Sequence, residues 1–288
     1  MQTIRQQPRQ GSTHAERLSG RSGYFAPESV IRRIGNTPVT PFLGGGCAVL
    51  LQLAHPLVAA GVADHSGYDA DLWRRLTQTL RALYLITFGT KAEAERAGAA
   101  VQAVHKHVHG TTRTRLGSFP AGTPYSAADP QLMLWVHATL VHASLSAYQR
   151  FEHKLSPAEQ EEYYRDMAIV AQLFGTPGAV IPRTLADFRE YFTTQIAGET
   201  IAVTPIAREI AGVILSAPLP APMRMLAPAH RLATAAQLPP RLRHEYGLRW
   251  TPLHELALPI AGRTVRYATA PALTFAARLR PLGRALAA

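Results

Sequence analysis

Helical periodicity of the apolar residues limits what this chain can fold into more than any other feature. In DLWRRLTQTLRALYLITFG, apolar residues recur at spacings of three and four, which is typical of an amphipathic helix. No segment alternates convincingly between apolar and polar residues, and no Asn-Gly or Asp-Gly hairpin turn occurs. The pattern predicts an all-α fold. The buried stripe of this helix is expected to consist of Leu72, Leu76, Thr79, Leu80, Leu83 and Ile86.

Capping signals mark the starts of two further helices. Asp129 and Pro130 open a helix that runs to about Phe151, because Asp caps the free amides of a first turn and Pro fits its first position. Ser156 and Glu159 have the spacing of a capping box at the start of the next helix.

The segment from Lys91 to Val108 is Ala-rich and helical in pattern, and Gly110 is expected to act as its C-cap. More helices are expected over residues 158–173, 184–196, 204–215 and 223–236, with prolines in the joints between them. The sequence thus predicts a single globular helical domain of about ten helices.

Length and composition favour one folded unit. The chain has 288 residues, 47% of them hydrophobic, and a chain of this size buries about three quarters of its unfolded surface. Residues 26–250 are expected to form the domain. A polar, flexible arm precedes it over residues 1–25, and a basic helical tail, residues 251–288, packs on it.

A single cysteine, Cys47, excludes an internal disulfide, covalent haem attachment through CxxCH and cysteine-rich zinc modules. The familiar HExxH, ExxH, GxSxG, GxGxxG and P-loop motifs are also missing.

The chain is basic, with a formal net charge of +11 from 30 basic and 19 acidic residues. Because it contains no long basic run and no nucleic-acid-binding motif, nucleic acid is not an expected partner. Two interpretations of the basic tail remain open: a peripheral contact with an anionic membrane, or a helix packed on the domain with its charges in water. The tail has no acidic residue after Glu255, and its arginines are Arg263, Arg266, Arg278, Arg280 and Arg284.

No segment is expected to cross a membrane. The most hydrophobic stretch, residues 48–63, contains Gln52, His55 and Pro56 and is shorter than the roughly 20 residues that a bilayer requires. The first 25 residues lack the apolar segment of a secretory signal. A cytoplasmic protein is therefore expected.

Histidines are concentrated on apolar helices, and His105 is the best candidate ligand among them. Val101, Val104 and Val108 flank it, so its imidazole is expected to face the core. A buried imidazole requires a metal or a hydrogen-bonding partner. His109, four residues later, is expected on the same helix face. A proximal haem ligand and a two-His zinc site both suit this pattern. The other histidines on apolar segments are His55, His65, His107, His137 and His142.

Arg75 and Thr79 offer a complementary pair on the helix that contains the apolar stripe. They are four residues apart and therefore neighbours on one face. A guanidinium beside an apolar stripe is costly unless it meets a carboxylate, a haem propionate or a polarised oxygen. Arg75 can alternatively reach solvent or pair with Asp69 or Asp71.

At this point the sequence resembles a known family, the catalytic domain of MpaB and the rubber oxygenases (latex-clearing proteins). Five blocks occur in order over roughly residues 25–250: Gly45-Gly46, LLQLAHPLVAAGVADHSGY, RLTQTL followed by TFG, VHKHVHG, and PYSAADPQLMLWVHATLVHASLSAY. The resemblance implies a globin-reminiscent helical core. It also implies a non-covalently held haem b that activates dioxygen to cleave isoprenoid chains.

The resemblance also implies roles for individual residues. The family's proximal histidine corresponds to His105, although Gln102 and His109 stand where the family has flanking arginines. The distal R-x-x-K-T motif corresponds to Arg75 and Thr79, with Gln78 in place of the lysine that can cap the iron. The residues expected around the pocket as a second layer are His55, His65, Tyr125, Trp135 and His137.

The function expected on these grounds is that of a haem b-dependent oxygenase acting on a hydrophobic molecule such as an isoprenoid or a lipid. His105 would bind the iron, Arg75 and Thr79 would act on the distal side, and His109, His55 and His137 would contact the cofactor. The alternatives are a haem peroxidase-like or haem-sensing protein, and a non-enzymatic His-rich helical binding module.

Overall fold

The computed structural model describes residues 23–65, 70–216 and 221–285, with side chains at all of these except 70–76, 221–223 and 269–285. The described residues form twelve α-helices and one small two-stranded sheet, so the predicted all-α class is confirmed. The elements up to the sheet are α2 (Val30–Gly35), the π-helix η1 (Thr40–Gly44), α3 (Gly45–Leu53), α4 (Pro56–His65), α5 (Ala70–Phe88), α6 (Lys91–His107), β1 (His109–Thr111) and β2 (Pro124–Ser126). The remaining elements are α7 (Pro130–Phe151), α8 (Pro157–Leu173), the 3-10 helix η2 (Gly178–Val180), α9 (Leu185–Ala197), α10 (Pro205–Ser216), the 3-10 helix η3 (Ala221–Leu226), α11 (Ala227–Gln237), α12 (Pro240–Glu245) and α13 (Pro252–Ala285).

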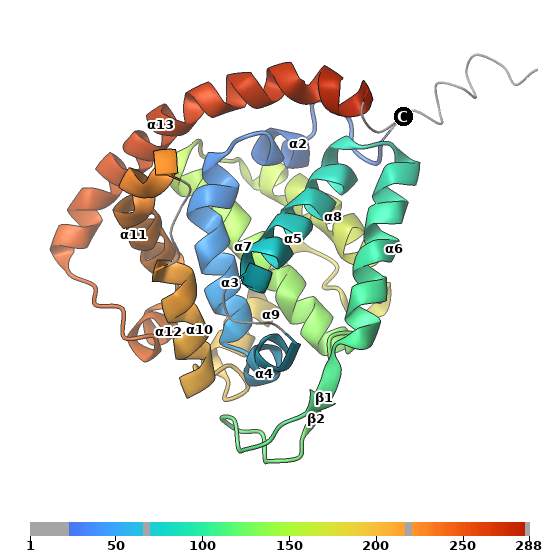
Figure 1. Ribbon diagram of the computed structural model, residues 1–288, viewed down its shortest axis with the longest axis vertical. Helices are drawn as coiled ribbons and strands as arrows, with labels where there is room; N and C mark the ends of the chain where they lie inside the picture. Colours follow the sequence, from blue (N-terminus) through green and yellow to red (C-terminus); the bar gives the residue numbers. More distant parts are fainter. Residues whose placement is uncertain (1–22, 66–69, 217–220, 286–288) are drawn as a thin grey trace, which may run out of the picture.

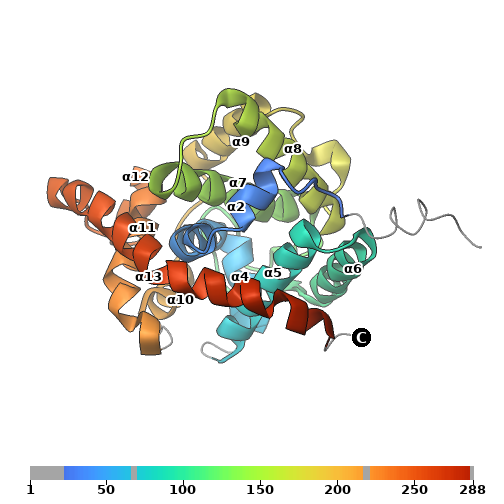
Figure 2. The same ribbon diagram turned by 90° about the horizontal axis from the view of Figure 1, so that it is seen from above.

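Helices α3 and α7 form the centre of the molecule (Figure 1). Trp135 of α7 is buried, donates its indole N–H to the Leu51 carbonyl of α3 at 3.1 Å, and stacks on Phe192 of α9. Helices α5 and α6 lie on one side of this pair, and α10, α11 and α12 lie on the other (Figure 1). The long helix α13 runs along the outside of the molecule (Figure 2).

The predicted capping residues act as expected. The Asp129 carboxylate accepts from the amides of Gln131 and Leu132 at 2.8 and 3.1 Å, and α7 begins at Pro130. Ser156 and Glu159 form the predicted capping box of α8. A further box, formed by Thr90 and Glu93, starts α6 and fixes where this helix begins.

The predicted bounds of α6 are within one residue of those observed, but the predicted C-cap, Gly110, is wrong. The helix ends at His107, because Val108 leaves the helical conformation and its carbonyl accepts from the Ala127 amide at 2.8 Å. Residues 109–111 then pair antiparallel with residues 124–126 in a sheet that the sequence did not predict. Gly110 lies in that sheet opposite Tyr125, whose ring occupies the space that a side chain at position 110 would need. It is therefore not a C-cap.

The predicted stripe of α5 is buried only toward the end of the helix. Ile86 is fully buried and Leu83 half-buried, but Thr79 and Leu80 are exposed. The side chains of Leu72 and Leu76 lie outside the described residues. Thr79 and Leu80, at the start of the described part of the stripe, therefore lie beside two cavities, which are described below.

The hydrophobic stretch 48–63 is divided between two largely buried helices, α3 and α4. In the part of the chain that the structure describes, no single helix has the length and composition to cross a bilayer. Residues 40–53 and 56–65 meet that criterion only as a pair, and they are bent by 101° relative to each other. In α13, Val265 is buried in a cluster with Val39, Leu43, Leu226 and Ala233.

Candidate functional site

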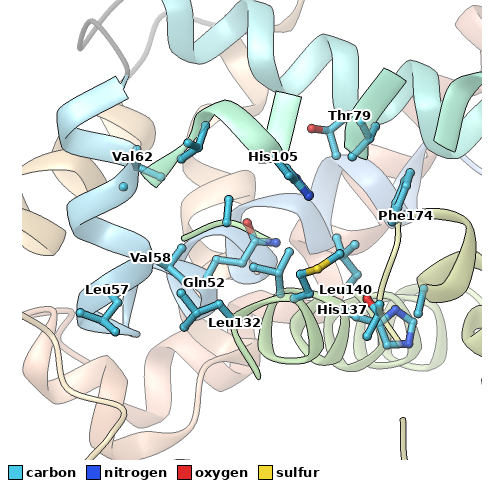
Figure 3. A pocket seen from close by; sticks show the side chains of 18 of the residues that line it. Gln52, Leu57, Val58, Val62, Thr79, His105, Leu132, His137, Leu140 and Phe174 are labelled. Atoms are coloured by element: carbon cyan, nitrogen blue, oxygen red, sulfur yellow. The ribbon is translucent and has the colours of Figure 1, made fainter. Parts of the chain in front are cut away.

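A cavity of about 210 Å³ lies where α3, α4, α5, α6 and α7 meet, beside the end of α8 (Figure 3). Most of the side chains around it are apolar, among them Val58, Leu132, Leu140 and Phe174. None of the described residues that line it carries an acidic, Lys or Arg side chain. The cavity therefore suits a molecule whose buried surface is mostly apolar and uncharged.

Helix α6 supplies His105, whose ring is directed into the cavity (Figure 3). Gly98 and Gln102, which precede His105 on α6, fix this helix against the end of α8. Gly98 lies so close to the Leu173 carbonyl that a Cβ atom there would collide with it, and the Gln102 amide donates to the same carbonyl at 2.9 Å. Gln102 thus holds α6 in place and helps to set the position of His105.

Helix α7 supplies His137 on another side of the cavity (Figure 3). Its side chain is 4% exposed, and neither ring nitrogen has a hydrogen-bond partner within the described part of the chain. Burial lowers the pKa of His137 to about 4 from its usual 6.5, so the ring is neutral at pH 7. A neutral imidazole offers one donor and one acceptor to a molecule in the cavity.

Helix α5 contributes Thr79, which also lines the cavity (Figure 3). The side chain of Arg75, its predicted neighbour, lies outside the described residues. The structure therefore brings together three of the predicted site residues, His105, His137 and Thr79, from three different helices.

Tyr125 of β2 closes another wall of the cavity. Its hydroxyl donates to the Asp64 carboxylate of α4 at 2.6 Å, and Arg113 lies 3.7 Å from that carboxylate. Burial, and then the bond to Asp64, raises the pKa of Tyr125 to about 12, so the phenol stays protonated. Its proton is held in a hydrogen bond that attaches the small sheet to α4.

Two of the predicted cofactor contacts do not reach the cavity. His109 is exposed on β1, and the prediction that it shares a helix face with His105 is wrong, because α6 ends before it. His55 is buried between α3 and α4, where its Nδ1 accepts from the Leu57 amide at 3.3 Å. Burial lowers its pKa to about 4.

Other predicted residues also have structural partners away from the cavity. The exposed His65 ring lies 3.1 Å from the His109 carbonyl oxygen. His142 stacks on Phe192 with ring centroids 4.3 Å apart. Trp135 belongs to the interface of α3 and α7 described above. Cys47 is fully buried, and burial raises the pKa of its thiol, so the thiol is protonated.

The donor set bears on which cofactor the cavity can hold. Among the described residues, no three His, Cys, Asp or Glu side chains are grouped as a metal-ion site, so a two-His zinc site has no third protein ligand there. A haem requires less from the protein, because the porphyrin supplies four nitrogens and one imidazole completes the coordination. His105 gives this apolar cavity the one nitrogen ligand that a haem requires, whereas no described lining residue carries a positive charge for the haem propionates, which would have to reach solvent.

Sequence reasoning missed several lining residues, of which Gln52 is the most informative. Its amide lies among the side chains that line the cavity (Figure 3). The available signal was a polar residue inside the apolar run LLQLAH. Thr176 and Phe174 follow the end of α8, where nothing in the local pattern connects them with α6.

Comparison with known proteins places the chain beside two mycobacterial relatives. It is 27% identical over 208 residues to uncharacterized protein Mb2261 of Mycobacterium bovis and, to the same extent, to uncharacterized protein Rv2237 of Mycobacterium tuberculosis. In both cases the match covers 70% of this chain and 78% of the relative. No solved structure matches the chain.

The family comparison covers most of the chain. A family model described as "ER-bound oxygenase mpaB/B'/Rubber oxygenase, catalytic domain" matches residues 32–267, a range that includes every residue that lines the cavity. The chain therefore belongs to the family of mpaB and rubber oxygenase catalytic domains.

Proposed function

We propose that this protein is a haem b-dependent oxygenase that uses dioxygen to oxidise or cleave a neutral, hydrophobic molecule such as an isoprenoid or a lipid. Membership of an oxygenase family supports the reaction class. The observation that carries the proposal is the His105 imidazole, directed into an apolar cavity that Thr79 and His137 also line.

In this proposal His105 holds the haem through a ring nitrogen. A bound haem supplies the redox-active iron that activates dioxygen. The apolar side chains of Val58, Leu140 and Phe174 would limit the access of water to the haem, which would strengthen polar interactions beside it. The protein's own contribution would thus be the His105 imidazole and a largely apolar enclosure.

His137 and Thr79 provide the polar groups of the enclosure. Because His137 is neutral at pH 7, one ring nitrogen keeps a proton that it can donate, and the other can accept. Thr79 offers a hydroxyl from the side of α5. Both groups orient a polar atom of the bound molecules without placing a charge in the cavity.

The substrate class follows from the lining. A charged substrate would lose its hydration without gaining an ionic partner among the described lining residues, which is costly. An uncharged, mostly apolar molecule loses little on entering and gains the burial of its own surface.

Haemin titration of the purified full chain tests the cofactor assignment. The wild-type protein should develop a Soret band that saturates at one haem per chain. His105→Ala should weaken binding by about tenfold or more, because the ring nitrogen that would hold the iron is lost. His107→Ala, at an exposed position two residues away, is the matched control and should bind as the wild type does.

Two results would overturn the assignment: no uptake of haemin by the wild-type protein, or wild-type binding by His105→Ala. The reaction class has a separate test. Incubation of the haem-loaded protein with squalene under isotopically labelled dioxygen should place the label in a product. Turnover that requires peroxide instead of dioxygen would indicate a peroxidase.

A further inference from the structure

A second cavity of about 300 Å³ lies between α5 and α7, with walls from α2, η1, α3 and α8. Protein interiors leave few voids larger than a water molecule. This volume is at the lower end of the roughly 300–1,000 Å³ range of small-molecule pockets. Leu140 lines both cavities, so one side chain of α7 stands between this space and the His105 site.

The second cavity is apolar, and one of its polar groups has no partner. No acidic or basic side chain is present among the described residues that line it. Tyr163 and Ser144 form a side-chain hydrogen bond with each other. Thr40, on the π-helix η1, is 5% exposed, and its hydroxyl has no hydrogen-bond partner within the described part of the chain. Such a group is usually satisfied by a bound molecule or water.

The side of the cavity formed by α5 is accessible from solvent. Leu80 and Tyr84 line the cavity and are 41% and 44% exposed, so they stand between it and the surrounding water. Large apolar side chains that are exposed at the mouth of an apolar cavity provide an entry surface for a hydrophobic molecule.

We propose that this cavity binds a neutral, mostly apolar molecule whose single hydrogen-bonding group meets the Thr40 hydroxyl. A charged head group would be desolvated there without a partner. Binding at this cavity requires no haem. We further assign this molecule as the substrate that is oxidised at the neighbouring His105 site, and this assignment rests on the proposed oxygenase function.

Calorimetric titration of the purified full chain with 1-octanol and with octanoate tests the site. The wild-type protein should bind 1-octanol at one site and octanoate at least about tenfold more weakly, because the carboxylate must be desolvated. Thr40→Val keeps the shape of the side chain but removes the hydroxyl. It should weaken 1-octanol binding by about fivefold.

A pair of matched glycine substitutions locates the ligand. Gly45 lines the cavity, and a Cβ atom added there meets no atom within 4 Å, so Gly45→Leu should fill the space and abolish binding. Gly212 of α10 is exposed and equally open, so Gly212→Leu should bind as the wild type does. Circular dichroism of both variants checks their folding.

Unchanged 1-octanol binding by a folded Gly45→Leu variant, or equal binding of octanoate and 1-octanol, would overturn the proposal. So would the absence of any 1-octanol binding by the wild-type protein. None of these results depends on haemin uptake, so failure of this proposal and failure of the haem assignment can be told apart.

A separate observation concerns the outer face of α13. Four large apolar residues, Leu253, Leu256, Ile260 and Tyr267, are 75%, 72%, 65% and 77% exposed. Their spacing of three, four and seven residues places them on one face of the helix. The opposite face is buried through Leu258, Ala261 and Val265. Exposed apolar stripes of this kind mark contacts with other molecules.

Most of the exposed charged side chains close to this stripe in sequence are positive, with Glu255 as an exposed acidic residue on α13 and Arg266 lying 3.7 Å from Glu152. Arg249 and Arg263 are exposed, and the chain contains no acidic residue after Glu255. Glu255 itself accepts from the Trp250 indole at 3.0 Å and lies 3.7 Å from Arg150. We infer that this face of α13 docks on an anionic lipid surface, with the apolar side chains in the headgroup region and the arginines near the phosphates.

Co-sedimentation with phosphatidylcholine vesicles, with and without phosphatidylglycerol, tests this docking. The wild-type protein should sediment with the anionic vesicles, less so at high salt, and Ile260→Asp combined with Tyr267→Asp should remain in the supernatant. Val104→Asp, at a 55% exposed apolar position on α6, is the control and should sediment as the wild type does. Unchanged sedimentation of the double variant would contradict the inference. A dimer in ultracentrifugation that this variant dissociates would assign the stripe to a second copy instead.

Discussion

His137 and His55 are both buried, and burial lowers the pKa of each to about 4 in the folded protein, from a usual 6.5. Below pH 6.5 the unfolded chain binds protons at these rings that the folded chain does not bind. Above pH 6.5 these rings are neutral in both states, so they impose no protonation penalty on the free energy of unfolding. As the pH falls from 6.5 toward 4, the unfolded chain gains protons first and the free energy of unfolding falls. Each ring removes up to roughly 3 kcal/mol of stability over that window.

We expect the free energy of unfolding to fall less steeply between pH 6.5 and 4 in His137→Phe and His55→Phe than in the wild type. Asp166 acts in the opposite direction below pH 6, because burial raises its pKa to about 6 and the folded state then binds the extra proton. The measurement is therefore the difference between variant and wild type in denaturant unfolding at several pH values. An equal slope in the variants and the wild type would contradict the burial of these rings.

His137 should also lower the stability of the haem-free protein at pH 7. A buried polar group without a partner is destabilising by about 1–3 kcal/mol. His137→Phe should accordingly raise the unfolding free energy of the haem-free protein by about 1 kcal/mol, measured by urea denaturation. A loss of stability would show that His137 has a partner in the folded chain.

At the scale of elements, the approach of α6 to α8 sets the position of the site. Gly98→Ala should destabilise the protein by about 1–3 kcal/mol, because the new Cβ atom collides with the Leu173 carbonyl and pushes the helices apart. The same substitution at Gly212, in open space on α10, should stabilise the protein by roughly 0.5–1 kcal/mol through helix propensity. Urea unfolding of the two variants measures both effects, and effects of the same sign would contradict the close packing of α6 on α8.

The sequence predicted the start of a helix better than its end. Asp129 with Pro130, and Ser156 with Glu159, act through residues within one turn, so a local pattern is enough to find them. The end of α6 depends instead on pairing with residues 124–126, which are distant in sequence. A three-residue strand is too short to produce a period-two signal, and Gly110 suits a C-cap as well as it suits the space beneath Tyr125.

The burial of the α5 stripe also depends on elements that are distant in sequence, which explains why the sequence predicted it only in part. Apolar periodicity identifies the face that avoids water but does not show whether another helix covers it. Ile86 is covered by neighbouring elements, whereas Leu80 and Thr79 border the two cavities. An apolar stripe that is only partly covered is therefore a sign of a binding surface as well as of a core.

At the scale of the whole molecule, the sequence correctly indicated the family and the all-α fold class. His105 and Thr79 were predicted by pattern and by resemblance, and the structure places both at one cavity. His55 and His109 were predicted from the same concentration of histidines and do not reach it. The difference arises from tertiary packing, because the break between α3 and α4 and the end of α6 decide which imidazoles face inward.

Imidazole rescue of a His105→Gly variant tests the central claim most directly, since it asks whether a nitrogen ligand is required at that one position. The haemin-treated variant should show a weak or shifted Soret band, and added imidazole should restore the wild-type spectrum by occupying the space that the side chain left. A wild-type spectrum of the variant without imidazole, or no response to imidazole when the wild-type protein does bind haemin, would contradict the assignment of His105 as the iron ligand.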